Sequence, residues 1–345
     1  MRFPIIGTLN TDSMKQIDLV VTKTPLRVSF LGGGTDIEYF YKNYGGSVLS
    51  CAINKYVYVT VKRHSQCFKE KFRLNYSKSE SKNQLNKIKN NIVRECIKLT
   101  KIDFPIYIST VGDVPAGSGL GGSSSFTVGL LKALYAIQGK NVKKKRLFEE
   151  SCKIEISILK EPIGKQDQVP AVYGGLNFIN FKKNNSIKIE NIKKSKIHNN
   201  LFNKSILIWT QSTRSASEVL KNQKKNFKSN IKRLEKIKAN ADIFYQSIRL
   251  NKKIDLKKLG DLVNDSWQEK KKLSDKISLK KIDMIINNAI KIGCYGAKLL
   301  GAGGGGFIII FGEKKHINAM KKKHKGLVYL NFNLNTMGSE VISIV

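Results

Sequence analysis

One segment of the sequence, residues 115–125, constrains the fold more than any other. Its eleven residues read Pro-Ala-Gly-Ser-Gly-Leu-Gly-Gly-Ser-Ser-Ser, and eight of them are glycine or serine. A strand-like run (104–110) precedes it, and apolar residues at helical spacing follow from Phe126 to Ile137. Glycines let a ligand approach the backbone closely, and a glycine-rich turn that opens onto a helix N-terminus is a ready anion site. We therefore expect a phosphate-binding loop.

Two common phosphate loops do not fit this segment. Gly122 is followed directly by Ser123, so the lysine of a Walker A loop is missing. Gly117, Gly119 and Gly122 match the dinucleotide pattern G-x-G-x-x-G, but residues 139–145 lack the acidic residue that this site needs. A flexible Gly/Ser linker is the plain alternative. The strand-like and helical flanks argue against it.

Composition narrows the class of protein. With 345 residues, one or two domains are expected, and no apolar stretch is long enough to span a bilayer. No secretory signal pattern is visible. The five cysteines are scattered without a C-x-x-C pair, which favours free thiols in a reducing compartment over disulfides or zinc ligands. We expect a cytoplasmic protein without a membrane partner. The sequence leaves open whether it forms a homodimer.

The net charge of +36 raises the alternative of nucleic-acid binding. The lysines, however, are spread over most of the chain and mix with asparagine and isoleucine, as in residues 182–185 and 224–226. No helix-turn-helix, zinc-finger or RNA-recognition pattern accompanies them. We interpret the charge as a solvated lysine-rich surface, with a general attraction for anionic substrates left open, and expect no nucleic-acid partner.

The element pattern predicts an α+β fold without regular βαβ alternation. We expect strands over residues 20–31, broken at Thr24-Pro25, and over 47–62, 104–110, 172–179, 205–210, 307–311 and 326–330. We expect helices over 82–100, after residue 125, and over 146–161, 214–249, 255–272 and 282–292. The lysine- and asparagine-rich segment 181–204 is interpreted as a linking hairpin or loop. It divides the chain into domains of residues 1–200 and 201–345.

Two further segments carry candidate chemical groups. In residues 27–36, three glycines precede Asp36, whose carboxylate suits sugar hydroxyls; the alternative is a helix N-cap. In residues 161–168, Asp167 lies in a polar turn after a proline-terminated helix, although it could form a surface ion pair with a lysine. Glu155 borders an apolar helical stripe, and a partly buried carboxylate there would suit Mg²⁺. Paired acids beside a phosphate loop suggest phosphoryl transfer.

A second glycine-rich turn, residues 296–307, precedes a strand near the C-terminus. A plain tight connection is one interpretation. A run of four glycines more often means that another backbone or a ligand approaches closely.

Residues 25–36, 115–125 and 298–307, in this order, resemble the three motifs of the GHMP small-molecule kinases, which include galactokinase, homoserine kinase and mevalonate kinase. Galactokinase-like members carry Gly-Glu-His-Thr-Asp where this chain has Gly-Gly-Gly-Thr-Asp at residues 32–36. With residues 163–168, 212–217 and 266–274, this segment is similar to the D-glycero-D-manno-heptose 7-phosphate kinases, with fucokinase-like enzymes as the nearest alternative.

The resemblance implies a two-domain fold, with an N-terminal domain like the second domain of ribosomal protein S5 and a ferredoxin-like C-terminal domain. It implies an ATP-dependent transfer to the anomeric hydroxyl of a heptose 7-phosphate, on the route to nucleotide-activated heptose. Another GHMP sugar kinase, or a non-catalytic sugar- or ATP-binding regulator, remains the alternative.

The resemblance also assigns roles to residues. Asp167 and Arg27 would be catalytic, and Ser123 (or Ser124) and Glu155 would hold Mg²⁺. The ATP loop would comprise Pro115, Gly117, Ser118, Gly119, Leu120, Gly121, Gly122, Ser123 and Ser124. The sugar-phosphate site would comprise Gly33, Gly34, Asp36, Lys165, Arg214, Gly303 and Gly304, with Arg214 and then Lys165 as candidates for the phosphate of the substrate.

Overall fold

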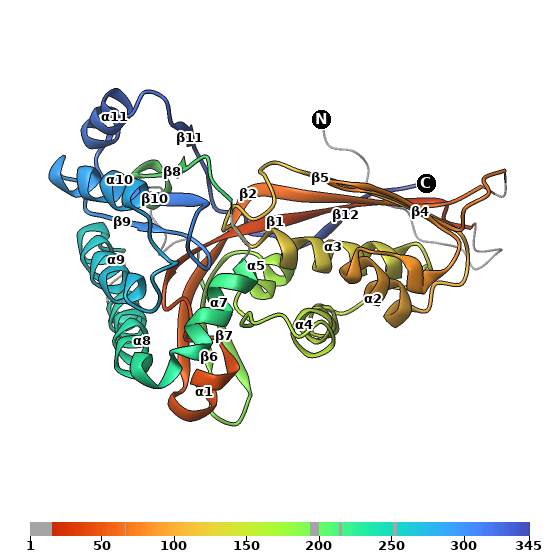
Figure 1. The fold of residues 1–345 in the computed structure, drawn as a ribbon, viewed down its shortest axis with the longest axis horizontal. Helices are drawn as coiled ribbons and strands as arrows, with labels where there is room; N and C mark the ends of the chain where they lie inside the picture. Colours follow the sequence, from red (N-terminus) through yellow and green to blue (C-terminus); the bar gives the residue numbers. More distant parts are fainter. Residues whose placement is uncertain (1–15, 66, 194–199, 214–215, 251–253) are drawn as a thin grey trace.

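The structure, a computed structural model, describes residues 16–65, 67–193, 200–213, 216–250 and 254–345. Arg214 and the N-terminal extension before Met14 therefore lie outside the described residues. Two β-sheets organise the described chain (Figure 1).

The first sheet is built around the long strand β2 (Gly46–Arg63). β1 runs antiparallel along one edge of β2, while the first half of β2 pairs with β6 and the second half with β5 on the other edge. β12 pairs with the outer edge of β1, so the C-terminal strand belongs to this sheet. The other strands are β1 (Leu19–Leu31), β3 (Phe72–Asn75), β4 (Ser79–Lys82), β5 (Ile106–Gly112), β6 (Leu176–Phe181), β7 (Ile187–Ile192) and β12 (Glu340–Ile344).

β1 stays continuous through Pro25, where the sequence predicted a break. Instead, the register with β2 shifts between Pro25 and Leu26, so Pro25 faces Tyr56 and Leu26 faces Ile53. Such a bulge accommodates proline and re-aims the residues after it. Just beyond it, the backbone N–H of Arg27 donates to the Leu120 carbonyl at 3.0 Å, which ties β1 to the glycine-rich loop.

Helices cover one face of the first sheet (Figure 1). They are α2 (Asn91–Thr100), α3 (Gly122–Ala136), α4 (Lys144–Cys152) and α5 (Gln168–Tyr173). In α3, Leu130, Ala133 and Leu134 are fully buried in the main core, and Phe126 packs against it partly buried. α1 (Glu38–Tyr44) follows β1, and a short 3-10 turn, η1 (Leu85–Lys87), precedes α2.

The second sheet has the order β11-β8-β10-β9 and is antiparallel throughout. Its strands are β8 (Ser205–Trp209), β9 (Gly296–Leu299), β10 (Phe307–Phe311) and β11 (Val328–Leu330). Its helices are α6 (Asn200–Asn203), α7 (Ala216–Lys225), α8 (Phe227–Leu250), α9 (Leu256–Lys271), α10 (Lys280–Lys291) and α11 (Lys314–Lys323). The chain passes from the first sheet to the second between β7 and β8, and it returns to the first sheet with β12. The proposed domain boundary near residue 200 stays a prediction.

Several expected elements were wrong in extent. The helix predicted over 82–100 begins only at Asn91, because the side chain of Asn90 caps it by accepting from the Val93 N–H at 3.1 Å. The strand predicted over 172–179 begins only at Leu176, with β6. Residues 172 and 173 still belong to α5, and Gly174 and Gly175, with φ of 71° and 74°, form the turn between the two elements. The helix predicted over 146–161 continues beyond α4 as a π-helical segment, η2 (Lys153–Ile158). The segment 181–204 contains the hairpin strand β7.

Candidate active site

The glycine-rich loop joins β5 to α3 and has the backbone that its sequence requires. Gly117, Gly119 and Gly121 have φ of 71°, 81° and 76°, in the left-handed region that favours glycine. Gly121 is the N-cap of α3, and no side chain caps the helix. The first amides of a helix have no partner inside it, so those at Gly122, Ser123 and Ser124 face an open N-terminus suited to phosphate.

The second glycine-rich turn packs directly on this loop. A Cβ on Gly301 would lie 2.6 Å from the Cα of Gly119, and a Cβ on Gly306 would lie 2.4 Å from the Ser118 carbonyl oxygen. The Phe307 N–H also donates to the Ser118 carbonyl at 3.0 Å. The four-glycine run is therefore a site of close backbone approach, as one of the two interpretations predicted.

Arg27 and Asp167 form a two-pronged ion pair at the pocket. Nε and Nη2 of Arg27 donate to Oδ1 and Oδ2 of Asp167, each at 2.7 Å. Nη1 of Arg27 donates to the Gly119 carbonyl at 2.5 Å, so one guanidinium joins β1, the phosphate loop and the start of α5. Asp167 is not the isolated surface ion pair that the alternative interpretation allowed.

Asp36 is buried and anchors the turn that carries Asp167. Its Oδ1 accepts from the Gln166 Nε2 at 2.7 Å and from the Gly34 N–H at 3.1 Å. Ser29 donates to the other end of the Gln166 amide at 2.8 Å. Burial, followed by the charge of Asp167, raises the pKa of Asp36 to about 6. Asp36 is not a helix cap, because α1 begins after Ile37.

Glu155 lies in the π-helical segment and is 1% exposed. π-Bulges interrupt helical spacing and often occur at functional sites. Ser123 donates to Glu155 Oε1 at 2.8 Å, and Gln168 donates to Oε2 at 2.7 Å. Burial outweighs these hydrogen bonds and raises the pKa of Glu155 to about 7. The amide oxygen of Gln168, Oε1, is buried and has no hydrogen-bond partner among the described residues.

Two lysines that the sequence analysis gave no role, Lys270 and Lys298, also line the pocket. The Lys270 ammonium donates to the Gly301 carbonyl at 2.6 Å, and the Lys298 ammonium donates to the Phe30 carbonyl at 2.9 Å. Burial, then Arg27, lowers the pKa of Lys270 to about 8. Burial and the neighbouring charge of Lys270 hold the pKa of Lys298 well below its usual range.

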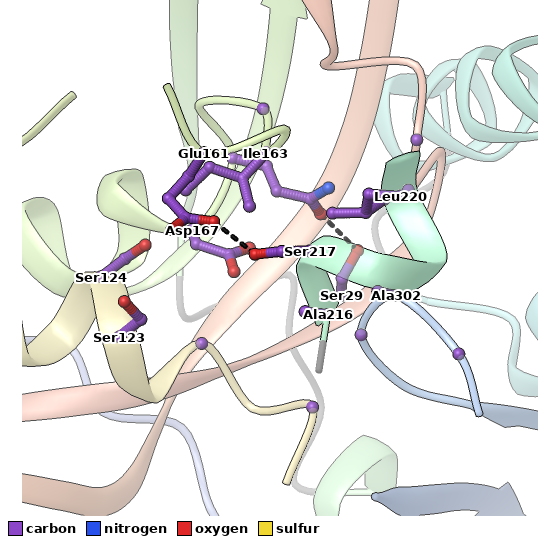
Figure 2. A pocket seen from close by; sticks show the side chains of 18 of the residues that line it. Ser29, Ser123, Ser124, Glu161, Ile163, Asp167, Ala216, Ser217, Leu220 and Ala302 are labelled. Atoms are coloured by element: carbon purple, nitrogen blue, oxygen red, sulfur yellow. Dashed lines mark hydrogen bonds between the residues drawn. The ribbon is translucent and has the colours of Figure 1, made fainter. Parts of the chain in front are cut away.

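One pocket collects most of the expected site residues (Figure 2). In Figure 2, Ser123 and Ser124 at the start of α3 lie on one side, and Ala216, Ser217 and Leu220 of α7 lie on the other. The expected residues that line it are Arg27, Gly33, Gly34, Asp36, Gly117, Ser118, Gly119, Gly121, Gly122, Ser123, Ser124, Glu155, Asp167 and Gly303.

Four expected residues do not line this pocket. Leu120 is fully buried in the core, and Pro115 is exposed. The Gly304 N–H donates to the Ile277 carbonyl at 2.7 Å. The Lys165 ammonium donates to Asn185 Oδ1 at 3.0 Å and lies 5.6 Å from the centre of the Tyr41 ring.

Within the described ranges, no three His, Cys, Asp or Glu side chains come together as a metal-binding group. Over the same described residues, no helix is both long and apolar enough to cross a membrane.

Comparison with known proteins places this geometry in a family. Residues 90–175 match the model of the GHMP kinases N-terminal domain, and residues 247–326 match that of the GHMP kinases C-terminal domain. The D-glycero-alpha-D-manno-heptose 7-phosphate kinase of Campylobacter jejuni is 32% identical over 326 residues, which cover 89% of this chain and 94% of that protein. A galactokinase of Thermotoga maritima is 24% identical over 87% of this chain and 91% of its own length.

Solved structures agree on the fold. A D-glycero-D-manno-heptose 1-phosphate kinase from Bacteriodes thetaiotaomicron superposes with a TM-score of 0.76, at 22% identity, over 94% of this chain and 99% of its own. The mevalonate kinase of Methanococcus jannaschii gives 0.68 at 24% identity, over 91% and 98%. The fold and the pocket are those of a small-molecule phosphotransferase. The chain belongs to the GHMP kinase family, and the expected α+β GHMP kinase fold is confirmed.

Proposed function

We propose that this kinase transfers the γ-phosphoryl group of ATP to the anomeric C1 hydroxyl of D-glycero-D-manno-heptose 7-phosphate, giving the 1,7-bisphosphate. The observation that carries phosphoryl transfer is the paired Arg27 and Asp167 beside an open helix N-terminus in one pocket. The heptose assignment is supported by the 32% identity to the C. jejuni enzyme over nearly the whole chain. The reaction would take place in the cytoplasm. Its product would be a precursor of nucleotide-activated heptose, which is used to build surface polysaccharide.

Asp167 is the proposed general base. Its carboxylate would accept the proton of the sugar hydroxyl as that oxygen bonds to the γ-phosphorus and the bond from phosphorus to the ADP oxygen breaks. Arg27 holds the carboxylate ionised and oriented through two 2.7 Å hydrogen bonds, and its positive charge offsets charge on the moving phosphoryl group. The amides of residues 117–124 would bind the ATP phosphates.

Glu155 and Ser123 would hold Mg²⁺. Their oxygens meet at 2.8 Å on the pocket wall beside the phosphate loop, and the buried carboxylate has no cationic side chain paired with it among the described residues. Mg²⁺ commonly takes one or two protein oxygens and completes its shell with phosphate and water, so the absence of a three-acid cluster in the described chain does not conflict with it. When bound, the ion would neutralise charge on the β- and γ-phosphates.

Gly33, Gly34 and Asp36 would bind the sugar, together with Gly303. The carboxylate of Asp36 already accepts three hydrogen bonds, so one or more of its remaining lone pairs would serve a sugar hydroxyl. Arg214, with Lys165 behind it, remains the proposal for the 7-phosphate. Lys165 would have to leave Asn185 to reach the pocket.

The test is an ADP-release assay with Mg²⁺ and ATP across heptose 7-phosphate, heptose 1-phosphate, unphosphorylated heptose, fucose and galactose. We expect the largest kcat/KM with heptose 7-phosphate and a ³¹P signal for a new anomeric phosphate. Preference for galactose or fucose would favour the alternative of another GHMP sugar kinase. No ADP release with any sugar would favour a binding regulator.

A further inference from the structure

The ammonium of Lys270 is a pocket-lining cation with unused donors. Lys270 lies in the last turn of α9, and its Nζ donates to the Gly301 carbonyl at 2.6 Å. Across the described residues, no carboxylate lies within 4 Å of it as an ion-pair partner. An ammonium group has three donors, and one neutral carbonyl satisfies only one of them. Lys270 is partly buried, and a partly buried charge without a counter-ion is costly, so an anionic ligand would stabilise this arrangement.

Lys270 and Arg27 lie on two sides of the same backbone contact. Lys270 donates to the carbonyl of Gly301, and a Cβ on Gly301 would lie 2.6 Å from the Cα of Gly119. Arg27 donates to the carbonyl of Gly119. The lowered pKa of Lys270 reflects burial and then Arg27, while Asp36 and Asp167 act in the opposite direction. Lys270 thus lies close enough to Asp167, the proposed base, and to Arg27 for their charges to affect its pKa.

The charge of Arg27, unlike that of Lys270, is already paired with the Asp167 carboxylate. Of the five N–H donors of its guanidinium, two are used by Asp167 and one by Gly119. Lys298 is a weaker alternative, because its pKa is held well below its usual range and it is 5% exposed. Lys270 is therefore the pocket cation whose charge is most available, and two of its three donors are unused.

We propose that Lys270 is a further catalytic residue, whose ammonium binds non-bridging oxygens of the transferring phosphoryl group on the side opposite Arg27. The proposal rests on the phosphoryl transfer proposed above. The phosphate that the sugar already carries is the other source of the same oxygens. We favour the transferring group because Lys270 is hydrogen-bonded to the turn that packs on the glycine-rich loop proposed to bind ATP.

The decisive variant is Lys270→Gln, because glutamine can still donate to the Gly301 carbonyl but carries no charge. Lys270→Arg keeps the charge. Lys271→Gln is the matched control, since Lys271 is the next residue of α9, does not line the pocket and has only a 3.9 Å contact with Asp283. For each protein, kcat and the two KM values are measured with the acceptor that the wild-type enzyme uses. The melting temperature and the Kd for ADP report on folding.

We expect Lys270→Gln to lower kcat about 10²–10³-fold, the usual effect of losing one donor to a developing oxyanion. The KM values and the Kd for ADP should stay within about threefold, because the lost contact belongs to the transition state. Lys270→Arg should recover part of kcat, and Lys271→Gln should match wild type. A wild-type kcat in Lys270→Gln, or a loss confined to the KM of a sugar phosphate, would overturn the proposal.

A second measurement separates this proposal from the sugar assignment. ADP, Mg²⁺ and aluminium fluoride mimic the transferring group without any particular sugar. In wild type and Lys271→Gln, we expect bound ADP to dissociate far more slowly with aluminium fluoride than without it. In Lys270→Gln, we expect the two dissociation rates to be similar. Equal retention in Lys270→Gln and wild type would overturn the role of Lys270, whichever sugar the enzyme phosphorylates.

Discussion

Arg27 donates hydrogen bonds to both carboxylate oxygens of Asp167, from Nε to Oδ1 and from Nη2 to Oδ2, each at 2.7 Å. The Asp167 side chain is 22% exposed, whereas that of Arg27 is 6% exposed. The carboxylate therefore faces the pocket while the guanidinium is enclosed behind it. This arrangement presents an oriented base to a ligand and keeps its counter-charge in place.

Asp167→Asn should lower kcat about 10²–10⁴-fold, the range that a positioned general base contributes. ATP should still bind, because the phosphate loop does not depend on this side chain. ADP release gives kcat, and equilibrium binding of ATP gives the Kd. Asp103→Asn, at an exposed position outside the pocket, is the control and should behave as wild type. Undiminished turnover in Asp167→Asn would remove Asp167 from the proposed role.

Arg27→Met should cost both activity and stability, because it leaves Asp167 without its counter-charge. Breaking a buried pair by removing one partner costs about 3 kcal/mol of unfolding free energy at the low end of the usual range, which suits the partial exposure of Asp167. Urea denaturation measures this loss. Lys42→Met removes a pair with Glu38 in which both side chains are about half exposed, and it should leave stability nearly unchanged. Similar losses in the two variants would contradict the importance of burial.

The raised pKa of Glu155 predicts a pH dependence of stability in the absence of ligands. The carboxyl of Glu155 has its ordinary pKa of 4.5 in the unfolded chain and a pKa of about 7 in the folded protein. The folded state binds more protons between these values, so this group lowers the free energy of unfolding as pH rises through the window. Asp36, with its pKa raised to about 6, acts in the same direction.

Glu155→Gln should remove the contribution of Glu155 to this fall of the unfolding free energy with rising pH. Relative to wild type, the variant should gain on the order of 3 kcal/mol of unfolding free energy between about pH 4.5 and about pH 8. Urea denaturation at the two pH values measures the difference. The exposed control Glu149→Gln should keep the wild-type slope. A variant slope equal to that of wild type would show that burial does not disfavour the charged form of Glu155.

Gly301→Ala should destabilise the protein and impair turnover. Gly301 has φ 73°, and a Cβ there would lie 2.6 Å from the Cα of Gly119. The left-handed conformation alone costs about 1–3 kcal/mol, and the clash would separate the second glycine-rich turn from the phosphate loop. A thermal melt and the KM for ATP measure the two effects. Gly326→Ala, with nothing within 4 Å of the added Cβ, is the control, and equal melting temperatures would contradict the close contact.

Residues 115–125 show what local sequence can predict. Three of the glycines in this loop have left-handed φ values, and the apolar pattern after it is the buried face of α3. These features depend on a few neighbouring residues, so they appear in the sequence as composition and spacing. The order of the three motifs then indicated the family, and the comparisons confirmed it.

Glu155 and Asp36 show where such prediction ends. The sequence placed Glu155 at the edge of a regular helix, but the π-helical segment buries it and brings it to Ser123, 32 residues away. Asp36 meets Gln166 across 130 residues. Neither contact leaves a periodic signal, because each depends on how separate elements pack.

The sequence by itself indicated the kinase family, and it predicted the phosphate loop and the candidates Arg27, Asp167 and Glu155. Only the tertiary structure decided which groups share one pocket, and it added Lys270 and Lys298 while leaving Lys165 outside. The physical reason is that lysines abound throughout this chain, so their number carries no positional information. What distinguishes Lys270 is its place in the pocket and its hydrogen bond to Gly301, and both arise only when α9 packs beside β9.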